Sequence, residues 1–466
     1  SVEDLRQELV DSIDRYRRER NRGTVTPFRP EFFDAEEGIV QIGEGSLGGK
    51  GRGLAFASRL LDEVRLAERF PDVQIEVPPA VVLGTSVFQD FLDLSDLRGF
   101  ALESDDESEI VRRFLVSPMP EEVRSSLAAV EAVLQGPIAV RSSSLLEDSP
   151  HHPFAGIYGT WILPNDDPDP QVRLAQLLNA VRRVYASTFS QRARSFLGAS
   201  PYRLEEEAMA VVIQRLVGRR HGEHFYPDLA GVARSHNDYP TAPASSADGI
   251  AAVALGLGKT VAEGEPCLRF SPPHPGHILE HASPREVLER AQREFWALRL
   301  DAPVPPVGWP QDGPLVRLPL KVAETDGTLA AVGSTYSAEN DVVYDGIGRP
   351  GARVVTFAPI LKHGLCPLAE ILQELLALGE AGTRLPVEIE CAASLARGKE
   401  RARLGFLQLR PLATNREDQD IRIDGYAAES VFCHSPSVLG HGRIPLQDWL
   451  VVDRERFDRS RSAECA

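Results

Sequence analysis

A short glycine-rich stretch limits most strongly how this chain can fold. Within residues 43–53, six glycines surround Lys50, and the amphipathic segment LAFASRLLDEV follows directly. Glycine lets backbone N–H groups approach an anion closely, a helix start adds a favourable dipole, and one lysine adds a mobile positive charge. The pattern predicts either a phosphate-binding turn that opens a helix or a flexible turn without a ligand.

Two stretches of the chain resemble a P-loop, and neither completes the pattern GxxxxGK[ST]. Around Lys50 that pattern would need glycine at Glu44 and a hydroxyl residue at Gly51. The later segment GLGKT has Val253 where the leading glycine should stand. We therefore expect no P-loop, and an ordinary turn between strand and helix at GLGKT.

The order of apolar segments predicts a mixed α/β fold. At 466 residues the chain is too long for a single core, so two or three domains are expected. The segment MAVVIQRLV is apolar almost throughout, which is typical of a central strand. Residues 43–64 read as a loop and then a helix, residues 73–92 as strand, turn and helix, and residues 136–150 as a strand that runs into a polar loop. Other strands are predicted at residues 155–164, 315–323, 386–392 and 405–412, and helices at 170–197 and 367–379.

Arg141 ends a strand of buried type and precedes three serines. A guanidinium is a rigid, permanently charged fork suited to phosphate oxygens, and hydroxyl groups donate to the same ligand. The alternative is a structural ion pair with Glu147 or Asp148, which follow closely in the sequence.

Two late strands carry polar side chains at alternate positions. Glu388 and Glu390 face one side of the first strand, and Gln408 and Arg410 repeat this spacing on the second. Carboxylate and amide oxygens on neighbouring strands can hold Mg²⁺, and an arginine beside them can neutralise a phosphate. The alternative is ordinary polar alternation on an exposed edge strand.

The remaining composition argues against several classes of partner. A formal net charge of −17 disfavours nucleic acid, and no segment has the ~20 uninterrupted apolar residues of a membrane span. Five scattered cysteines without CxxC spacing favour the reducing cytoplasm. The pairs His221/His224 and His277/His281 lack the frame of a metal motif, so solvated loop histidines are expected. Residues 1–30 are predicted to contain an amphipathic helix.

Taken in chain order, six segments resemble the ATP-grasp-type nucleotide domain of the phosphoenolpyruvate synthase and pyruvate phosphate dikinase family, to which rifampin phosphotransferase is related. The segments lie between residues 39 and 412 and read LGGKGRGLA, VPPAVVLGTSVFQDFL, IAVRSSSLLEDSPHHPFAGIYGTW, MAVVIQRLV, GLGKTVAEGE, and VEIE with FLQLRP. The resemblance implies a two-lobed mixed α/β fold with ATP between the lobes. The expected limits are 31–200 for the N-terminal lobe, 201–420 for the C-terminal lobe and 421–466 for a connector to further domains.

The resemblance also implies a role for each matched residue. Lys50, Arg141 and Arg410 would be the catalytic cations that bind phosphate, and Gly156 and Thr160 would lie over the triphosphate. A hinge that reads adenine is expected at Gln214, Leu216 and Val217. The expected Mg²⁺ ligands are Glu388, Glu390 and Gln408, and Glu390 and Gln408 would also contact ATP.

The activity implied is a dikinase half-reaction, in which ATP is cleaved and a phosphoryl group passes to a histidine on a separate swivelling domain. That domain and a pyruvate- or phosphoenolpyruvate-binding domain would be the partners. Lys259 departs from the family pattern, which usually has glutamate there, and the connection between Glu390 and Gln408 is longer than usual. A regulatory ATP sensor, or a kinase module acting on rifampin or a glucan, stays open as an alternative.

Overall fold

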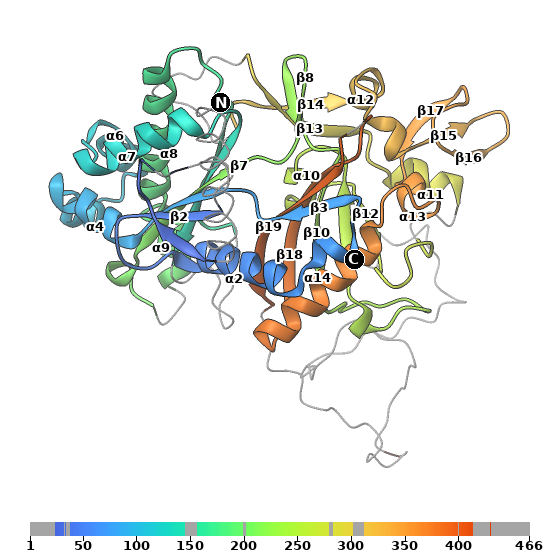
Figure 1. Cartoon of the computed structure of the whole chain (residues 1–466), viewed down its shortest axis with the longest axis horizontal. Coiled ribbons are helices and arrows are strands. Elements are labelled where there is room, and N and C mark those ends of the chain that lie inside the picture. The colour runs from blue at the N-terminus through green and yellow to red at the C-terminus, as the bar shows by residue number, and fades with distance from the viewer. Residues whose placement is uncertain are drawn as a thin grey trace, which may run out of the picture. The chain divides into compact units, whose positions relative to one another are not determined.

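The structure is a computed structural model, drawn in Figure 1. It describes residues 24–31, 33, 38–144, 156–198, 202–278, 283–301, 312–398, 400–412 and 429. The chain divides into two units, Ser1–Ala413 and Thr414–Ala466. All the helices and strands below belong to the first unit.

The first sheet is mixed and has six strands in the order β1-β2-β4-β7-β5-β6. β7 lies inside this sheet, as its apolar sequence predicts, and its first five residues are fully buried. Pairing is parallel from β1 to β4 and antiparallel from β4 to β6. The strands are β1 (Val25–Pro27), β2 (Ile39–Ile42), β4 (Ala80–Leu83), β5 (Ile138–Ser144), β6 (Thr160–Leu163) and β7 (Met209–Arg215).

Six helices bury their apolar sides against one face of the first sheet. Aromatic rings fill the space between them, with ring centroids 5.0 Å apart for Phe88 and Tyr185 and 5.6 Å apart for Phe91 and Phe114. Such tilted pairs are favourable arrangements of aromatic quadrupoles. The helices are α4 (Thr85–Leu94), α5 (Leu97–Glu103), α6 (Glu107–Val116), α7 (Glu121–Val133), α8 (Pro170–Ser187) and α9 (Gln191–Gly198).

The second sheet also has six strands, in the order β12-β11-β10-β18-β19-β3. Its neighbours are antiparallel except β3, which pairs in parallel with β19 although it comes from the first hundred residues. The second sheet thus contains a strand from the first half of the chain. The strands are β3 (Val73–Glu76), β10 (Leu229–Arg234), β11 (Ile250–Ala254), β12 (Leu268–Phe270), β18 (Val387–Ser394) and β19 (Ala402–Pro411).

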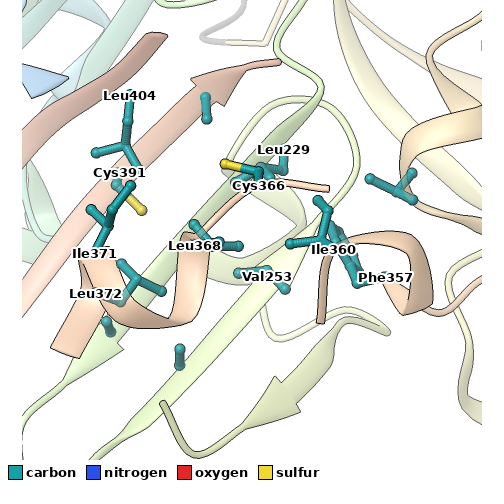
Figure 2. Close-up of a cluster of buried hydrophobic side chains, with 14 of the residues drawn as sticks. Leu229, Val253, Phe357, Ile360, Cys366, Leu368, Ile371, Leu372, Cys391 and Leu404 are labelled. Atoms are coloured by element: carbon teal, nitrogen blue, oxygen red, sulfur yellow. The ribbon is translucent and has the colours of Figure 1, made fainter. Parts of the chain in front are cut away.

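Helices α13 (Ala358–Leu361) and α14 (Leu368–Thr383) cover one face of the second sheet. The buried positions Leu368, Ile371, Leu372 and Leu375 follow the 3.6-residue period of an amphipathic helix. Figure 2 shows this apolar cluster, in which side chains of α14 lie beside Cys391 of β18. Burial raises the pKa of the Cys391 thiol to about 12, as expected for an ionisable group in an apolar core. The opposite face of the sheet therefore remains available for polar side chains.

Helix α2 (Gly48–Val64) lies against both large sheets, and its glycines make this possible. A Cβ atom on Gly48 would come within 1.6 Å of the Ser143 carbonyl oxygen on β5, and the φ angle of Gly48 is +70°. A Cβ atom on Gly53 would come within 2.4 Å of the Leu409 carbonyl oxygen on β19. From Gly48 onward, the glycine-rich stretch is therefore the closely packed start of a helix. The alternative of a flexible turn does not apply to these residues.

Two smaller sheets extend the second half of the chain. One has the order β14-β13-β9-β8, and the other has the order β16-β15-β17. Their strands are β8 (Arg219–His221), β9 (His224–Tyr226), β13 (Glu294–Arg299), β14 (Leu315–Pro319), β15 (Gly333–Ser337), β16 (Val342–Asp345) and β17 (Ala352–Val355). The remaining short helices are α3 (Leu66–Arg69), α10 (Lys259–Ala262), α11 (Pro284–Arg290) and α12 (Leu320–Thr325).

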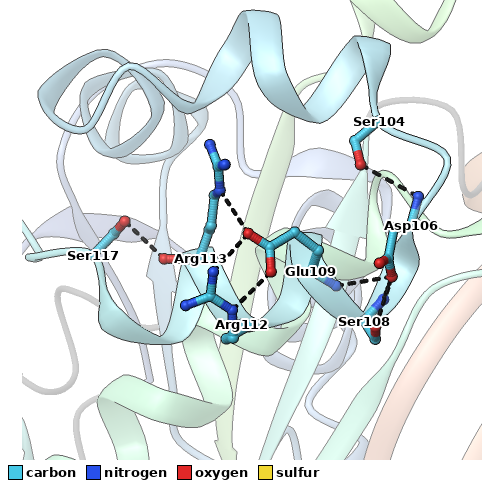
Figure 3. A network of polar contacts seen from close by, with 7 residues as sticks. All are labelled: Ser104, Asp106, Ser108, Glu109, Arg112, Arg113 and Ser117. Carbon is cyan, nitrogen blue, oxygen red and sulfur yellow. Dashed lines mark hydrogen bonds and ion pairs between the residues drawn. The ribbon is translucent and has the colours of Figure 1, made fainter.

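The N-terminal part of α6 carries a local network of charged side chains (Figure 3). The Asp106 carboxylate accepts hydrogen bonds from the backbone N–H groups of Ser108 and Glu109, which caps the helix. Glu109 in turn accepts from Arg112 and Arg113 at distances of 2.7 and 2.9 Å. Hydrogen bonds from these two arginines lower the pKa of Glu109 to about 2.

Several predicted elements are confirmed, and two need correction. The strands predicted at 386–392 and 405–412 are confirmed as β18 and β19, and the helix at 367–379 as α14. The predicted helix 170–197 is two helices, because the chain turns at 188–190 and the Ser190 hydroxyl caps α9 by accepting from the N–H of Ala193. The predicted strand 315–323 ends at Pro319, which cannot donate to the ladder, and continues as α12.

Part of the N-terminal prediction lies outside the described residues. Residues 1–23 of the amphipathic helix predicted within residues 1–30 belong to that part. Residues 25–27, which the same prediction placed in an N-terminal helical region, form strand β1.

Candidate functional site

The two large sheets line one cleft of about 1280 Å³. This volume exceeds the ~300–1,000 Å³ of typical small-molecule pockets, so the cleft has room for an extended ligand. The structure brings all eleven residues of the predicted site to this cleft, although their roles remain predictions. These residues are Lys50, Arg141, Gly156, Thr160, Gln214, Leu216, Val217, Glu388, Glu390, Gln408 and Arg410.

The first wall of the cleft places two cations close together. Lys50 lies in the first turn of α2, is 8% exposed, and its Nζ atom lies 3.5 Å from the Ser142 hydroxyl on β5. Arg141 points into the cleft from β5 because strand residues alternate, with Ile138 and Val140 facing the core. Thr160 pairs with Arg141 in the ladder between β5 and β6 and lines the same wall.

Arg141 reaches across the cleft to the second sheet. Its Nη2 atom donates to Glu390 Oε2 at 2.8 Å and to Gln408 Oε1 at 2.7 Å, and its Nη1 atom donates to the Leu407 carbonyl at 3.1 Å. Glu390 and Gln408 are direct neighbours in the ladder between β18 and β19. Their two side-chain oxygens therefore converge on one cationic nitrogen.

The cations around Glu390 stabilise the ionised form of its carboxyl group. Burial alone would raise the pKa of Glu390, but the charge and hydrogen bond of Arg141, together with Lys50 and Arg410, outweigh that effect. The pKa of Glu390 is consequently below its ordinary value of 4.5. Glu390 is thus an ionised carboxylate at neutral pH, which is the form that a hard metal cation requires.

Glu388 has a different environment from Glu390. Its Oε2 atom accepts from Arg234 Nε at 2.6 Å, and its Oε1 atom accepts from Arg410 Nε at 2.8 Å. The Glu388 side chain is 4% exposed, whereas that of Glu390 is 35% exposed. Sequence reasoning missed Arg234, because its importance depends on the pairing of β10 with β18, which no local motif reveals.

The other end of the cleft is largely apolar. Val217 packs with Ala230, Ala392 and Leu407 in a small cluster. Gln214 is 2% exposed, and its Nε2 atom has no hydrogen-bond partner among the described residues. An apolar cluster and an unsatisfied amide donor that line the same cleft suit a planar heterocycle that carries an acceptor atom.

The charge of the lining opposes that of the whole chain. Nine Lys and Arg side chains line the cleft against five Asp and Glu side chains, although the chain as a whole carries −17. A cationic cleft in an anionic protein concentrates an anionic ligand at that position. The electrostatics therefore favour a phosphorylated small molecule.

Lys259, which departs from the family pattern, also lines the cleft. It begins α10, forms ion pairs with Glu263 and Asp312, and lies 5.2 Å from the centroid of the Trp296 ring. Two carboxylates therefore offset its charge.

The long connection between Glu390 and Gln408 has a simple origin, because most of these residues extend β18 and β19, and only 395–401 join the strands.

The structure bears on several alternatives that the sequence left open. The edge-strand alternative is wrong, because β18 and β19 are interior strands. Arg141 pairs with Glu390 across the cleft, and Glu147 and Asp148 lie outside the described residues. Among the residues that the structure describes, no three His, Cys, Asp or Glu side chains form a metal cluster. Within the same part of the chain, no helix is long and apolar enough to cross a bilayer.

Two mixed sheets that share one cleft, with basic side chains and carboxylates meeting inside it, define a two-lobed α/β protein of the ATP-grasp type. The family model described as "Pyruvate phosphate dikinase, AMP/ATP-binding domain" matches residues 44–429. The chain belongs to this family and is an ATP-binding module of the dikinase type.

The chain is also similar to the phosphoenolpyruvate synthase of Aeropyrum pernix. It is 27% identical to this chain over 167 residues, which cover 31% of the chain and 20% of the relative. The match thus spans about a fifth of the relative's length, and the activity of that whole protein does not transfer with it.

Proposed function

We propose that the chain binds Mg-ATP in the cleft and passes a phosphoryl group from it to a histidine on a separate swivelling domain. The observation that carries the proposal is the contact of Arg141 with Glu390 and Gln408. It supports a single site in which cations of the first sheet and oxygens of the second act on one polyphosphate. Lys50, Arg141 and Arg410 would bind the phosphates, with Gly156 and Thr160 beside them.

The residues present fit a magnesium ion. Glu390 offers an ionised carboxylate and Gln408 an amide oxygen, and both oxygens already point at one positively charged atom, Arg141 Nη2. Mg²⁺ prefers oxygen donors from one or two side chains together with phosphate oxygens, and when bound it neutralises phosphate charge. Arg141, deprived of these two acceptors, would then donate to a phosphate oxygen. Glu388 was predicted as a third ligand, and its two arginine partners argue against that role.

The transfer itself needs no nucleophile from this chain. A neutral imidazole nitrogen would use its lone pair to form a bond to the β-phosphorus of ATP while the bond from that phosphorus to the oxygen that stays on AMP breaks. Water would then release the terminal phosphate as inorganic phosphate, which leaves one phosphoryl group on the histidine. The leaving oxygen keeps the electron pair, and the three cations offset its charge. Adenine would occupy the apolar end beside Gln214, Leu216 and Val217.

The same proposal includes the limits of the two lobes, the partner domains and the cellular location of the protein. We place the lobes at 31–200 and 201–420, with 421–466 leading to a histidine domain and a domain that binds pyruvate or phosphoenolpyruvate. A cytoplasmic location rests on the cysteine pattern of the sequence. The A. pernix relative is named for phosphoenolpyruvate synthesis, which is the ground for this choice of partners.

The test uses ATP radiolabelled at its β-phosphate and the histidine domain of a phosphoenolpyruvate synthase. We expect label on that domain and AMP in solution, and loss of both with Arg141→Ala. Tight ATP binding without AMP, even when the histidine domain is supplied, would contradict transfer and favour a regulatory sensor. Lys259 in place of the usual glutamate is the observation that favours this second candidate. Label on rifampin or a glucan would keep the chemistry and change the acceptor.

A further inference from the structure

Three charged residues form a row across the cleft face of the second sheet. Glu388 on β18 lies opposite Arg234 on β10 and opposite Arg410 on β19 in the strand register. Both arginines donate to its carboxylate, one to each oxygen. All three side chains line the cleft.

The burial of the row increases towards its centre. The side chain of Glu388 is 4% exposed, that of Arg410 is 22% exposed and that of Arg234 is 48% exposed. A metal ion in the cleft would have to displace a guanidinium from a nearly inaccessible carboxylate. Both Glu388 oxygens already accept from a guanidinium, and the side chain is far less exposed than that of Glu390, so Glu388 is poorly suited to bind metal.

We propose that Arg234 is a further polyphosphate-binding residue and that Glu388 is a positioning residue which holds Arg234 and Arg410 towards the ligand. The inference rests on the proposed function, since it names additional contacts in the same site. Sequence motifs did not point to Arg234, and its role follows from the strand register alone.

Electrostatics explain why a carboxylate lies between the two arginines. Two guanidinium groups directed at one ligand repel each other, and Glu388 offsets this repulsion while leaving the row with a net positive charge. Arg234 uses Nε for Glu388, and its guanidinium makes no other hydrogen bond to a described residue. Its terminal nitrogens thus remain available for phosphate oxygens, for which a guanidinium has suitable geometry.

The first experiment compares binding of Mg-ATP and of AMP by calorimetry. We expect Arg234→Gln to weaken Mg-ATP binding about tenfold and to leave AMP binding unchanged, because AMP lacks the outer phosphates. Arg234→Lys should recover part of the loss. Arg285→Gln is the matched control, since Arg285 is also paired with a glutamate but is exposed and outside the cleft.

The second experiment separates a positioning role for Glu388 from metal binding. Mg-ATP affinity of Glu388→Gln is measured over a range of Mg²⁺ concentrations, with circular dichroism to verify folding. We expect weaker binding at every concentration and an unchanged half-saturating Mg²⁺ concentration. A clear rise in that concentration would make Glu388 a ligand and overturn its assignment. Equal Mg-ATP affinity of Arg234→Gln and the unmodified protein would overturn the role of Arg234, whereas no ATP binding by the unmodified protein would instead refute the proposed function.

Discussion

Two clusters in this protein pair arginine with glutamate, and they differ in sequence separation and in location. On α6, Glu109 binds Arg112 and Arg113, which follow it by three and four residues, on an exposed helix surface. In the cleft, Arg141 binds Glu390 and Gln408, which lie 249 and 267 residues away in the sequence. The first cluster satisfies one helix, whereas the second joins two sheets. The arginine of the cleft cluster is 13% exposed, whereas those of the α6 cluster are 65% and 48% exposed. We infer that the long-range pair directed into a cavity is the better guide to a binding site.

Removing one arginine from each cluster tests whether only the cleft cluster contributes to Mg-ATP binding. Arg141→Ala should raise the Kd for Mg-ATP about 100-fold, because several charge-assisted hydrogen bonds are lost. Arg112→Ala should leave that Kd unchanged. Calorimetric titration measures both, and equal effects of the two substitutions would show that the distinction is wrong.

A more specific substitution tests the proposed metal ligand. Glu390→Gln keeps the shape of the side chain and removes its charge, so we expect the half-saturating Mg²⁺ concentration to rise about tenfold. AMP binding in the absence of metal should be little changed. The titration is repeated with Glu109→Gln as the control, and an unaltered Mg²⁺ dependence in Glu390→Gln would remove Glu390 from the ligand set.

Acid should remove the stabilising contribution of Glu390 in the cleft. The pKa of Glu390 is lowered in the folded protein, so its stabilising contribution is present above its ordinary pKa of 4.5 and is lost as the pH falls through the lowered value. The urea midpoint of Glu390→Gln should therefore lie below that of the unmodified protein at neutral pH, and the gap should narrow as the pH falls below 4.5 and through the lowered pKa. A gap that stays constant over this range would contradict the assignment of the pKa shift to Glu390.

The smallest effect is expected on the exposed cluster. Glu109→Gln removes two ion pairs that are open to water, where Coulomb attraction is weak and salt screens it. We expect no resolvable change in the thermal midpoint at moderate salt. A large loss of stability would show that local surface pairs matter more in this chain than the comparison allows.

The sequence predicted the members of the site better than it predicted their contacts. Arg141, Glu390 and Gln408 could be identified because motif order and strand alternation are local properties. Their mutual contact could not, since it depends on how two sheets approach each other. Arg234 gave no signal at all, because its significance comes from facing Glu388 across a ladder between distant segments.

The errors in secondary structure have equally local causes. A turn at 188–190 divides a segment whose apolar period is nearly continuous, and the only local signal for it is Ser190, which caps the start of the second helix. Pro319 ends a strand whose apolar residues continue into a helix. Likewise, the parallel pairing of β3 with β19 depends on a contact more than 300 residues apart, which no sequence period encodes.

The most direct test is a crystal structure of this chain with Mg²⁺ and a non-hydrolysable ATP analogue. The account predicts the polyphosphate between Lys50 and Arg141 on one side and Arg410 on the other, with the metal bound to Glu390 and Gln408. A nucleotide bound elsewhere, or a polyphosphate in contact with only one of the two sheets, would contradict it.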